Sequence, residues 1–273
     1  NNNSKKVGTY NVGYYSNQQG YDLIGGRGTL EITPKDVYVT GFTTQDRAYD
    51  GSTAITVTGT ANLNWSQTVG SDDIVFTYTG AGTGTGAVAD KNVGNNKDVT
   101  VTLNGTMGLI GADAGNYNLV MPTLKANITP AILTYTANAA SRKYGEINPL
   151  FTGSVTGFVT GEDLATATTG TAGFNSTATT TSNVGNYAID GSGLTANHGN
   201  YVFVQAASNA NAFTINPATL SYVADAQNRI YGGANPTFTG TVTGFVNGED
   251  LATATTGTLG FNSTATQTSN VGS

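Results

Sequence analysis

The chain has 273 residues, of which 38% are hydrophobic and only 10% are charged, and its formal net charge is −6. The absence of cysteine excludes disulfides, thiolate catalysis and cysteine-based zinc sites. The acidic balance, with no concentration of Lys and Arg, argues against nucleic-acid binding, and no run approaches the ~18 apolar residues of a membrane span.

Residues 1–33 look like the second half of a repeat module. Val7-Gly8-Thr9-Tyr10 resembles the later Val184-Gly185-Asn186-Tyr187, and Leu30 to Pro34 resembles the later Ile-x-Pro segments. We therefore expect this stretch to be the C-terminal half of a truncated module, so that the chain is a window cut from a longer array.

Residues 34–129 are predicted to form a complete β module. Alternation of apolar and polar residues indicates strands over 53–59, 74–78 and 99–103. The Gly-rich stretch Gly80–Gly86 lacks the Lys-Ser/Thr ending of a phosphate loop and is predicted to be a flexible hairpin loop.

Residues 130–216 and 217–273 are predicted to be a second module and the N-terminal part of a third. The segments that start at Ile128 and Ile215 align without a gap at an offset of 87 residues, and roughly three-quarters of their positions match. A unit of this length can close its own small core, which favours separate modules over a continuous solenoid. The only helical candidates are Gly161–Ala165 and Gly248–Ala252, where a capped turn is an equal alternative.

The joints between modules are short. Ile-Thr-Pro or Ile-Asn-Pro leads from one module into the next at Pro34, Pro130 and Pro217, without a Gly/Ser spacer. Proline fixes its own φ and extends its predecessor, so reorientation between modules should be restricted. The expected fold is mainly β, with tandem small β-sandwich-like or β-grasp-like modules in an elongated array.

Several ordered motifs resemble known repeat families. Tyr49-Asp50-Gly51, Ala89 to Gly94 and Gly111 to Tyr117 resemble the YDG repeat, and Tyr144-Gly145, Asn148-Pro149, Gly161-Glu162-Asp163 and Val184 to Tyr187 resemble the YGX-type MBG repeat. The resemblance implies a YDG-type module over 34–129, an MBG module over 130–216 and part of another over 217–273. It further implies a large bacterial exoprotein similar to filamentous haemagglutinin, and hence a secreted or surface location.

No catalytic, cofactor-binding or metal residue is predicted. The only histidine is His198, in a turn. Glu162-Asp163 recur as Glu249-Asp250, and since a repeated catalytic pair would be unusual, we predict a solvated turn. Tyr144-Gly145 and Tyr231-Gly232 are interpreted as folding signals. Asp72-Asp73 and Glu162-Asp163 could contribute to a calcium site, but the dense spacing of a calcium loop is absent.

Three roles stay open at this stage, all without enzymatic activity. The first is a structural stalk or spacer of an adhesin that supports cell adhesion or biofilm formation, with neighbouring modules as its partners. The second is direct binding of a surface glycan through exposed Tyr and Asn. The third is homotypic assembly, in which half-modules at the two ends complete one another between copies of the fibre.

Overall fold

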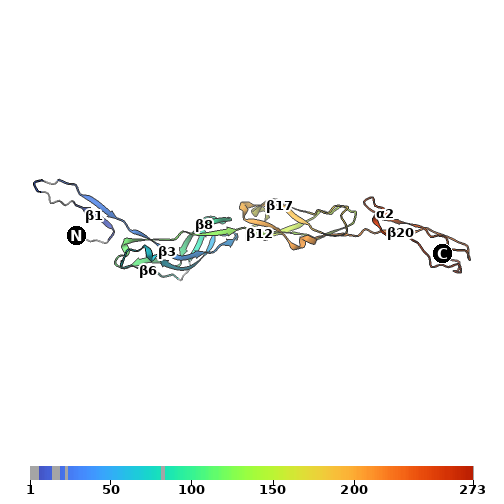
Figure 1. The fold of residues 1–273 in the computed structure, drawn as a ribbon, viewed down its shortest axis with the longest axis horizontal. Helices are drawn as coiled ribbons and strands as arrows, with labels where there is room; N and C mark the ends of the chain where they lie inside the picture. The colour runs from blue at the N-terminus through green and yellow to red at the C-terminus, as the bar shows by residue number, and fades with distance from the viewer. Residues whose placement is uncertain (1–5, 14–18, 22–23, 81–83, 273) are drawn as a thin grey trace. The chain divides into compact units, whose positions relative to one another are not determined.

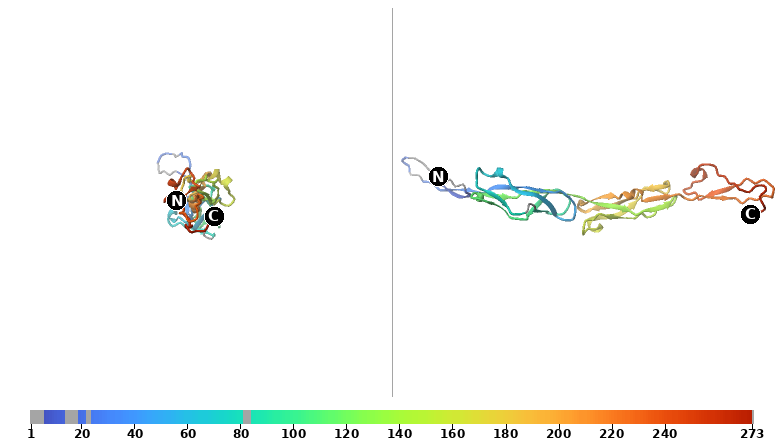
Figure 2. Two further views of the ribbon diagram at one scale, coloured as in Figure 1. Left: turned by 90° about the vertical axis from the view of Figure 1, so that its right-hand side faces the viewer. Right: turned by 90° about the horizontal axis from the view of Figure 1, so that it is seen from below.

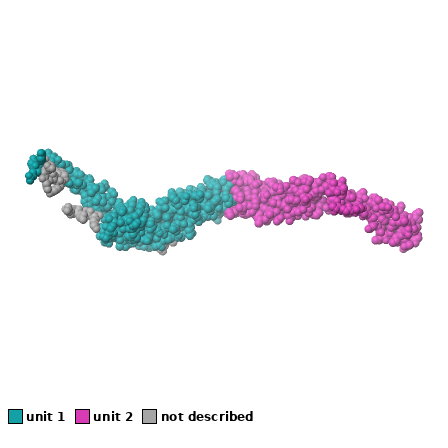
Figure 3. Space-filling view, in the orientation of Figure 1, with its two compact units in different colours: residues 1–131, 159–162, 196–202 teal, residues 132–158, 163–195, 203–273 magenta. Residues whose placement is uncertain are grey.

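The computed structural model describes residues 6–13, 19–21, 24–80 and 84–272. Strands dominate these residues and the helices are short, so the prediction of a mainly β fold is confirmed. The chain divides into two compact units (Figure 3). Unit 1 comprises residues 1–131, 159–162 and 196–202, and unit 2 comprises residues 132–158, 163–195 and 203–273.

The centre of unit 1 is a seven-stranded sheet that curls into a half-barrel. Its strand order is β10-β3-β5-β7-β8-β11-β4, and these strands lie side by side in Figures 1 and 2. The strands are β3 (Lys35–Thr44), β4 (Arg47–Ala48), β5 (Ala54–Leu63), β7 (Gly84–Val88), β8 (Gly94–Leu103), β10 (Tyr117–Val120) and β11 (Leu124–Thr129).

Two antiparallel strand pairs and three short 3₁₀ helices accompany this sheet in unit 1. The pairs are β1 (Gly8–Val12) with β2 (Gly28–Ile32) and β6 (Val75–Tyr78) with β9 (Met107–Ile110). The 3₁₀ helices are η1 (Trp65–Gln67), η2 (Ala114–Asn116) and η3 (Asn197–Gly199).

The core of unit 1 follows from the alternation of residues along the strands. Val37 and Val39 of β3 are fully buried, and Val37 clusters with Leu63 and Tyr117. Because successive side chains of a strand point to opposite faces, the intervening Tyr38 is exposed. The predicted strands over 53–59, 74–78 and 99–103 fall on β5, β6 and β8.

The prediction of a flexible loop over Gly80–Gly86 is wrong for Gly84–Gly86, whereas Gly80 lies in a bend after β6. Residues 81–83 lie outside the described residues, but Gly84 and Gly86 belong to β7, which pairs with both β5 and β8. A Cβ atom at Gly86 would lie 2.7 Å from the side chains of Val57 and Val99. Glycine therefore serves close packing inside the sheet at this position, and not loop flexibility.

Residues 131–216 form three small sheets, with strand orders β14-β12-β18, β13-β19-β16 and β15-β17. One turn of helix α1 and the 3₁₀ helix η4 connect them. The bounds are β12 (Ala131–Ala137), β13 (Ala140–Lys143), β14 (Gly153–Thr156), α1 (Leu164–Ala167), β15 (Thr168–Asn175), β16 (Gly185–Tyr187), β17 (Asp190–Ala196), β18 (Tyr201–Gln205), η4 (Ala207–Asn211) and β19 (Phe213–Asn216).

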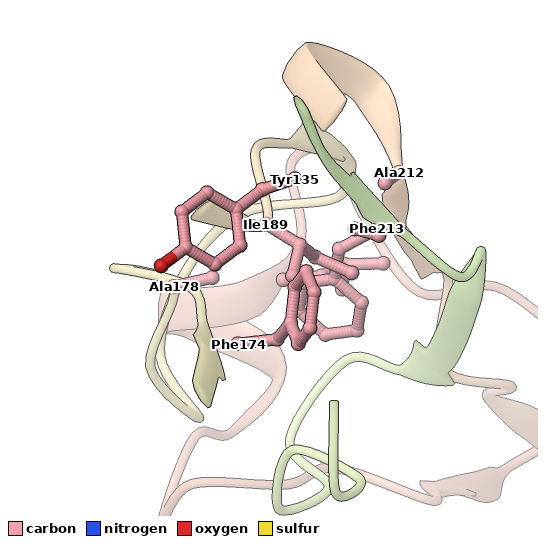
Figure 4. Close-up of a cluster of buried hydrophobic side chains, with 8 residues drawn as sticks. Tyr135, Phe174, Ala178, Ile189, Ala212 and Phe213 are labelled. Carbon is pink, nitrogen blue, oxygen red and sulfur yellow. The ribbon is translucent and has the colours of Figure 1, made fainter. Parts of the chain in front are cut away.

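The core of unit 2 is a cluster of aromatic and aliphatic side chains (Figure 4). Ile189 and Phe213 are fully buried, and Tyr135 packs edge-on against Phe174 with ring centroids 6.0 Å apart. Asn209 is also buried; its side chain accepts the Ala137 N–H and donates to the Tyr135 carbonyl. Full hydrogen bonding explains why a polar group is tolerated there.

The strand pairing repeats along with the sequence. In the last module β20 (Ser221–Ala224) pairs with β21 (Gly240–Thr243), and Tyr222 faces Val242 as Tyr135 faces Val155 in the β12–β14 pair. Likewise Gly8 faces Ile32 in the β1–β2 pair as Gly185 faces Ile215 in the β16–β19 pair. Sequence similarity at these places therefore reflects the same register.

The helical candidate becomes one helical turn in both copies. Helices α1 and α2 (Leu251–Ala254) each begin after an aspartate, Asp163 or Asp250, whose side chain accepts the N–H of the residue three positions later. Both turns also carry the reciprocal bond of a capping box. No helix in the described part of the chain is long and apolar enough to cross a membrane.

Candidate functional site at the module joints

A mostly buried, hydrogen-bonded carboxylate of unit 1 belongs to Glu162. Its turn, Val159–Glu162, is closed by a bond from the Glu162 N–H to the Val159 carbonyl, and Asp163 then caps α1. The turn comes from the second module of the sequence, yet it belongs to the compact unit of the first. We call this contact between residues 34–129 and the segments 159–162 and 196–202 joint one.

Three donors from distant parts of the sequence converge on the Glu162 carboxylate. Tyr49 Oη and Lys91 Nζ donate to Oε1 at 2.5 and 2.6 Å, and Tyr201 Oη donates to Oε2 at 2.7 Å. The Glu162 side chain is 15% exposed. A carboxylate this buried is stable only when it is paired and hydrogen-bonded, and here both oxygens are satisfied.

The two tyrosines also form the apolar wall of joint one. Tyr49 and Tyr201 are buried, and their rings meet edge to face with centroids 5.4 Å apart. Lys91 Nζ lies 5.7 Å from the centroid of the Tyr49 ring, within the range of a cation–π contact. The Tyr201 hydroxyl accepts the Val159 N–H at 3.1 Å, which fixes the turn that carries Glu162.

A second set of bonds in joint one centres on Asn200, which is buried. The Val93 N–H donates to its Oδ1 at 2.9 Å, and its Nδ2 donates to Asn92 Oδ1 at 3.0 Å. Its backbone carbonyl accepts the Ala131 N–H. The Gly-Asn-Tyr motif of one module thus binds the Asn-Val-Gly motif of the module before it.

The environment of joint one favours the charged carboxylate. Burial by itself raises the pKa of Glu162, but the hydrogen bonds from Lys91, Tyr49 and Tyr201 outweigh it and hold the pKa below its ordinary value of 4.5. Burial, with the neighbouring carboxylate, raises the pKa of Tyr201 to about 12. The pKa of Tyr49 is also raised, chiefly by burial and then by Glu162. At neutral pH the site is a carboxylate held by two neutral phenols and one ammonium group.

Unit 2 contains a similar contact, joint two, between the first and second MBG-like segments. Tyr144 Oη donates to Glu249 Oε1 at 2.7 Å, and Asn247 Nδ2 donates to the Thr180 carbonyl. Glu249 lies 87 positions after Glu162, in a turn closed by the same bond, from its N–H to the Val246 carbonyl. A cavity of about 360 Å³ lies beside this contact, lined by Tyr144, Val184, Leu220, Val246 and Glu249 among others.

A glycine after each tyrosine receives a valine of the next module. A Cβ atom at Gly51 would lie 3.2 Å from Val159 Cγ2, and one at Gly145 would lie 2.5 Å from Val246 Cγ2. Both glycines have left-handed backbones, with φ of +80° and +85°. Each joint therefore has a tyrosine that supplies a hydroxyl for the acid and a nearby glycine, in Tyr49-Asp50-Gly51 or Tyr144-Gly145, that supplies a bare backbone surface for the valine.

Two domain models match most of the chain. The YDG domain matches residues 33–126, and the MBG domain (YGX type) matches residues 133–214 and 220–273. The chain is a tandem array of YDG and MBG domains. Both domains fit repeat modules of adhesin-like proteins. No curated protein and no solved structure matches the chain.

The joints of this YDG–MBG array revise two interpretations of the sequence. The prediction of a solvated turn is wrong for Glu162, because its side chain is mostly buried and bonded to three partners. The Tyr144-Gly145 pair is more than a signal for local folding, since Tyr144 reaches the acid of the following module, as Tyr49 of the Tyr-Asp-Gly sequence does in joint one. The sequence did carry a signal for these contacts, since Tyr–Gly and Val-x-Gly-Glu both repeat at one common offset.

The other residues that the sequence singled out are engaged locally. Asp72 accepts the Tyr117 hydroxyl, and Asp73 accepts the Ala112 N–H. His198 sits in η3 with a left-handed backbone. Among the described residues no group of three or more His, Cys, Asp or Glu side chains gathers as metal ligands would.

Proposed function

We propose that this chain is a structural spacer in a large secreted or surface-anchored bacterial adhesin, supporting cell adhesion or biofilm formation. In this role it acts outside the cell, without catalysis and without a cofactor. The observation that carries the proposal is joint one, where a mostly buried carboxylate of the MBG module is bound by two donors of the YDG module.

A spacer requires joints that keep their geometry under thermal motion. A Gly/Ser linker would let modules reorient freely. In joint one, bonds at Glu162 and Asn200 act together with an edge-to-face ring contact, so bending would break several contacts at once. Use of the same Tyr–acid bond in joint two supports a general rule for joining modules.

Stiffness of joint one can be measured with spin labels. The Cys-free chain allows a label at Thr102→Cys in the YDG module and another at Thr160→Cys in the Val159–Glu162 turn; both positions are exposed. Pulsed electron–electron double resonance should give one narrow distance distribution, which Glu162→Ala broadens. A broad distribution in the otherwise native sequence would refute a stiff joint.

Direct glycan binding is a second candidate, favoured by two exposed aromatic side chains on unit 1. Tyr38 is 42% and Trp65 is 47% exposed. The Tyr38 N–H donates to the Gln67 side chain, and its carbonyl accepts the Asn64 N–H, so β3 and η1 present both rings from adjoining backbone. Exposed aromatic rings beside amide side chains suit sugar faces. Saturable binding on a glycan array, lost in Trp65→Ala, would favour this role over the spacer.

A further inference from the structure

The YDG module contains a third copy of the acid-bearing turn. Tyr117 Oη accepts the Val69 N–H at 2.8 Å and donates to Asp72 Oδ2 at 2.7 Å. In joint one, Tyr201 Oη accepts the Val159 N–H and donates to Glu162 in the same way. In both cases the acid follows the valine by three positions, and the tyrosine follows a Gly-Asn pair.

Strands β1 and β2 precede the YDG module in the sequence. The segment that contains them contacts this third copy of the turn in the way that the YDG module contacts the turn of joint one. The Val7 N–H donates to Asn116 Oδ1 at 3.0 Å, and the Val93 N–H donates to Asn200 Oδ1 at 2.9 Å in joint one. The Tyr10 hydroxyl of β1 donates to the carbonyl four residues earlier, as the Tyr187 hydroxyl of β16 does. Asn116 therefore makes the same bond to a valine N–H that Asn200 makes in joint one.

The two turns differ in how far the valine side chain is covered by other residues. Val159 lies against the Gly51 backbone, whereas residue Val69 is 53% exposed. A cavity of about 440 Å³ lies there, lined among others by Val7, Ile32, Val69, Asp72 and Tyr117. None of the residues that the structure describes places a Tyr–Gly pair against this valine and acid.

We propose that Val69, Asp72 and Tyr117 form a receiving site for the Tyr–Gly loop of a preceding repeat module in the same polypeptide. The tyrosine hydroxyl donates to Asp72, and the glycine backbone covers Val69, as in joint one. The site deepens the proposed spacer function by extending its joining rule to the YDG module. Because aspartate is one methylene shorter than glutamate, the incoming tyrosine must approach this module more closely.

The chain itself supplies a suitable loop for the test. Tyr231-Gly232 follows Tyr144-Gly145 by 87 positions. Residue Tyr231 is 62% exposed, and a Cβ atom at Gly232 would meet nothing within 4 Å. A tandem chain can be made in register by following residue 272 of one copy with residue 9 of the next. Val271-Gly272 then takes the place of Val7-Gly8.

Disulfide formation tests the contact directly, since the sequence has no cysteine. Gly232→Cys in the first copy and Val69→Cys in the second should form a disulfide within the tandem chain. The control pair is Gly51→Cys with Val159→Cys in the single chain, where a Cβ at Gly51 lies 4.0 Å from the Val159 Cβ, inside the range of about 3.5–4.5 Å for disulfides.

The outcomes separate this site from the spacer proposal. If the control pair closes and the Gly232–Val69 pair stays reduced, the receiving site is overturned and joint one stands. If neither pair closes, the joint geometry itself fails, and with it the support for the spacer. A disulfide that forms between tandem chains and not within one would overturn the in-chain source of the loop.

A chemical readout avoids cysteine at the strained glycine. Nitration of Tyr231 in the first copy of the tandem chain should be several-fold slower than in the single chain. Val69→Lys in the second copy removes the docking surface at an exposed position and should restore fast nitration. Protection that persists with Val69→Lys would come from completion of the first copy's own module, and would overturn the proposal.

Discussion

Joint one and joint two share a Tyr–acid bond, yet they surround the acid differently. Glu162 accepts bonds from Tyr49, Lys91 and Tyr201, whereas the side-chain bond found for Glu249 in the described residues comes from Tyr144. In the motif that corresponds to Lys91-Asn92-Val93-Gly94, the MBG module has Ser182 in place of Lys91. The Tyr–acid bond is therefore the common element, and the cation is an addition of the YDG module.

The packing of glycine against valine differs in the opposite sense. A Cβ atom would lie closer to the facing valine at Gly145 in joint two than at Gly51 in joint one. Joint two therefore depends more on shape, and joint one more on hydrogen bonds. This contrast predicts different sensitivities to mutation.

Removal of the acid should have the largest effect. Glu162→Ala leaves two buried tyrosine hydroxyls without their acceptor, and we expect a loss of about 2–3 kcal/mol in the free energy of unfolding. Glu249→Ala should cost about 1 kcal/mol, because one hydrogen bond is lost. Urea unfolding followed by the single tryptophan, Trp65, measures the first, and circular dichroism measures both. Equal losses at the two positions would contradict the contrast between the joints.

Substitution of the joint glycine comes next. Gly145→Ala adds a Cβ 2.5 Å from Val246 Cγ2 on a backbone with φ of +85°, and we expect a loss of about 2 kcal/mol. Gly232→Ala is the matched control, with φ of +83° and no neighbour within 4 Å, so it should cost about 1 kcal/mol from backbone strain alone. The difference between the melting temperatures of the two variants measures the packing at joint two. Equal melting temperatures would show that Gly145 does not contribute to that packing.

Acid should weaken joint one through Glu162. Since the folded pKa of Glu162 lies below its ordinary 4.5, the carboxylate stabilises the fold above pH 4.5, and this contribution is lost as pH falls through the folded pKa. The melting temperature of the native sequence should therefore fall more steeply below pH 4.5 than that of Glu162→Gln. If the melting temperatures of the native sequence and of Glu162→Gln fell in parallel below pH 4.5, protonation of Glu162 would not weaken joint one.

The smallest effect is expected from adding the missing cation. Ser182→Lys places an ammonium group at the position that Lys91 has in joint one. Relative to Ser182→Met, which equally lacks the bond from the Thr179 N–H to Ser182 Oγ, a partly exposed ion pair with Glu249 should add about 0.5 kcal/mol. The gain should disappear in 1 M salt and in the Glu249→Gln background. A gain that survives both would have another origin.

The sequence was sufficient for the class of fold and for three strands of the YDG module, β5, β6 and β8. Alternation in β5 and β8 shows directly which side chains point inward, because a strand has a period of two. It was not sufficient for Gly84 and Gly86, where a run of glycine looks like a loop and only the side chains of Val57 and Val99 explain the need for a bare backbone.

By itself, the sequence determined that a unit recurs at 87 residues and that Tyr–Gly and Val-x-Gly-Glu recur with it. Only the tertiary structure decided that these motifs bind each other across a joint. Tyr49 and Glu162 are 113 positions apart, and a period states that residues return without stating which of them meet. Their contact depends on how two sheets end and turn, a matter of three-dimensional packing that no local pattern encodes.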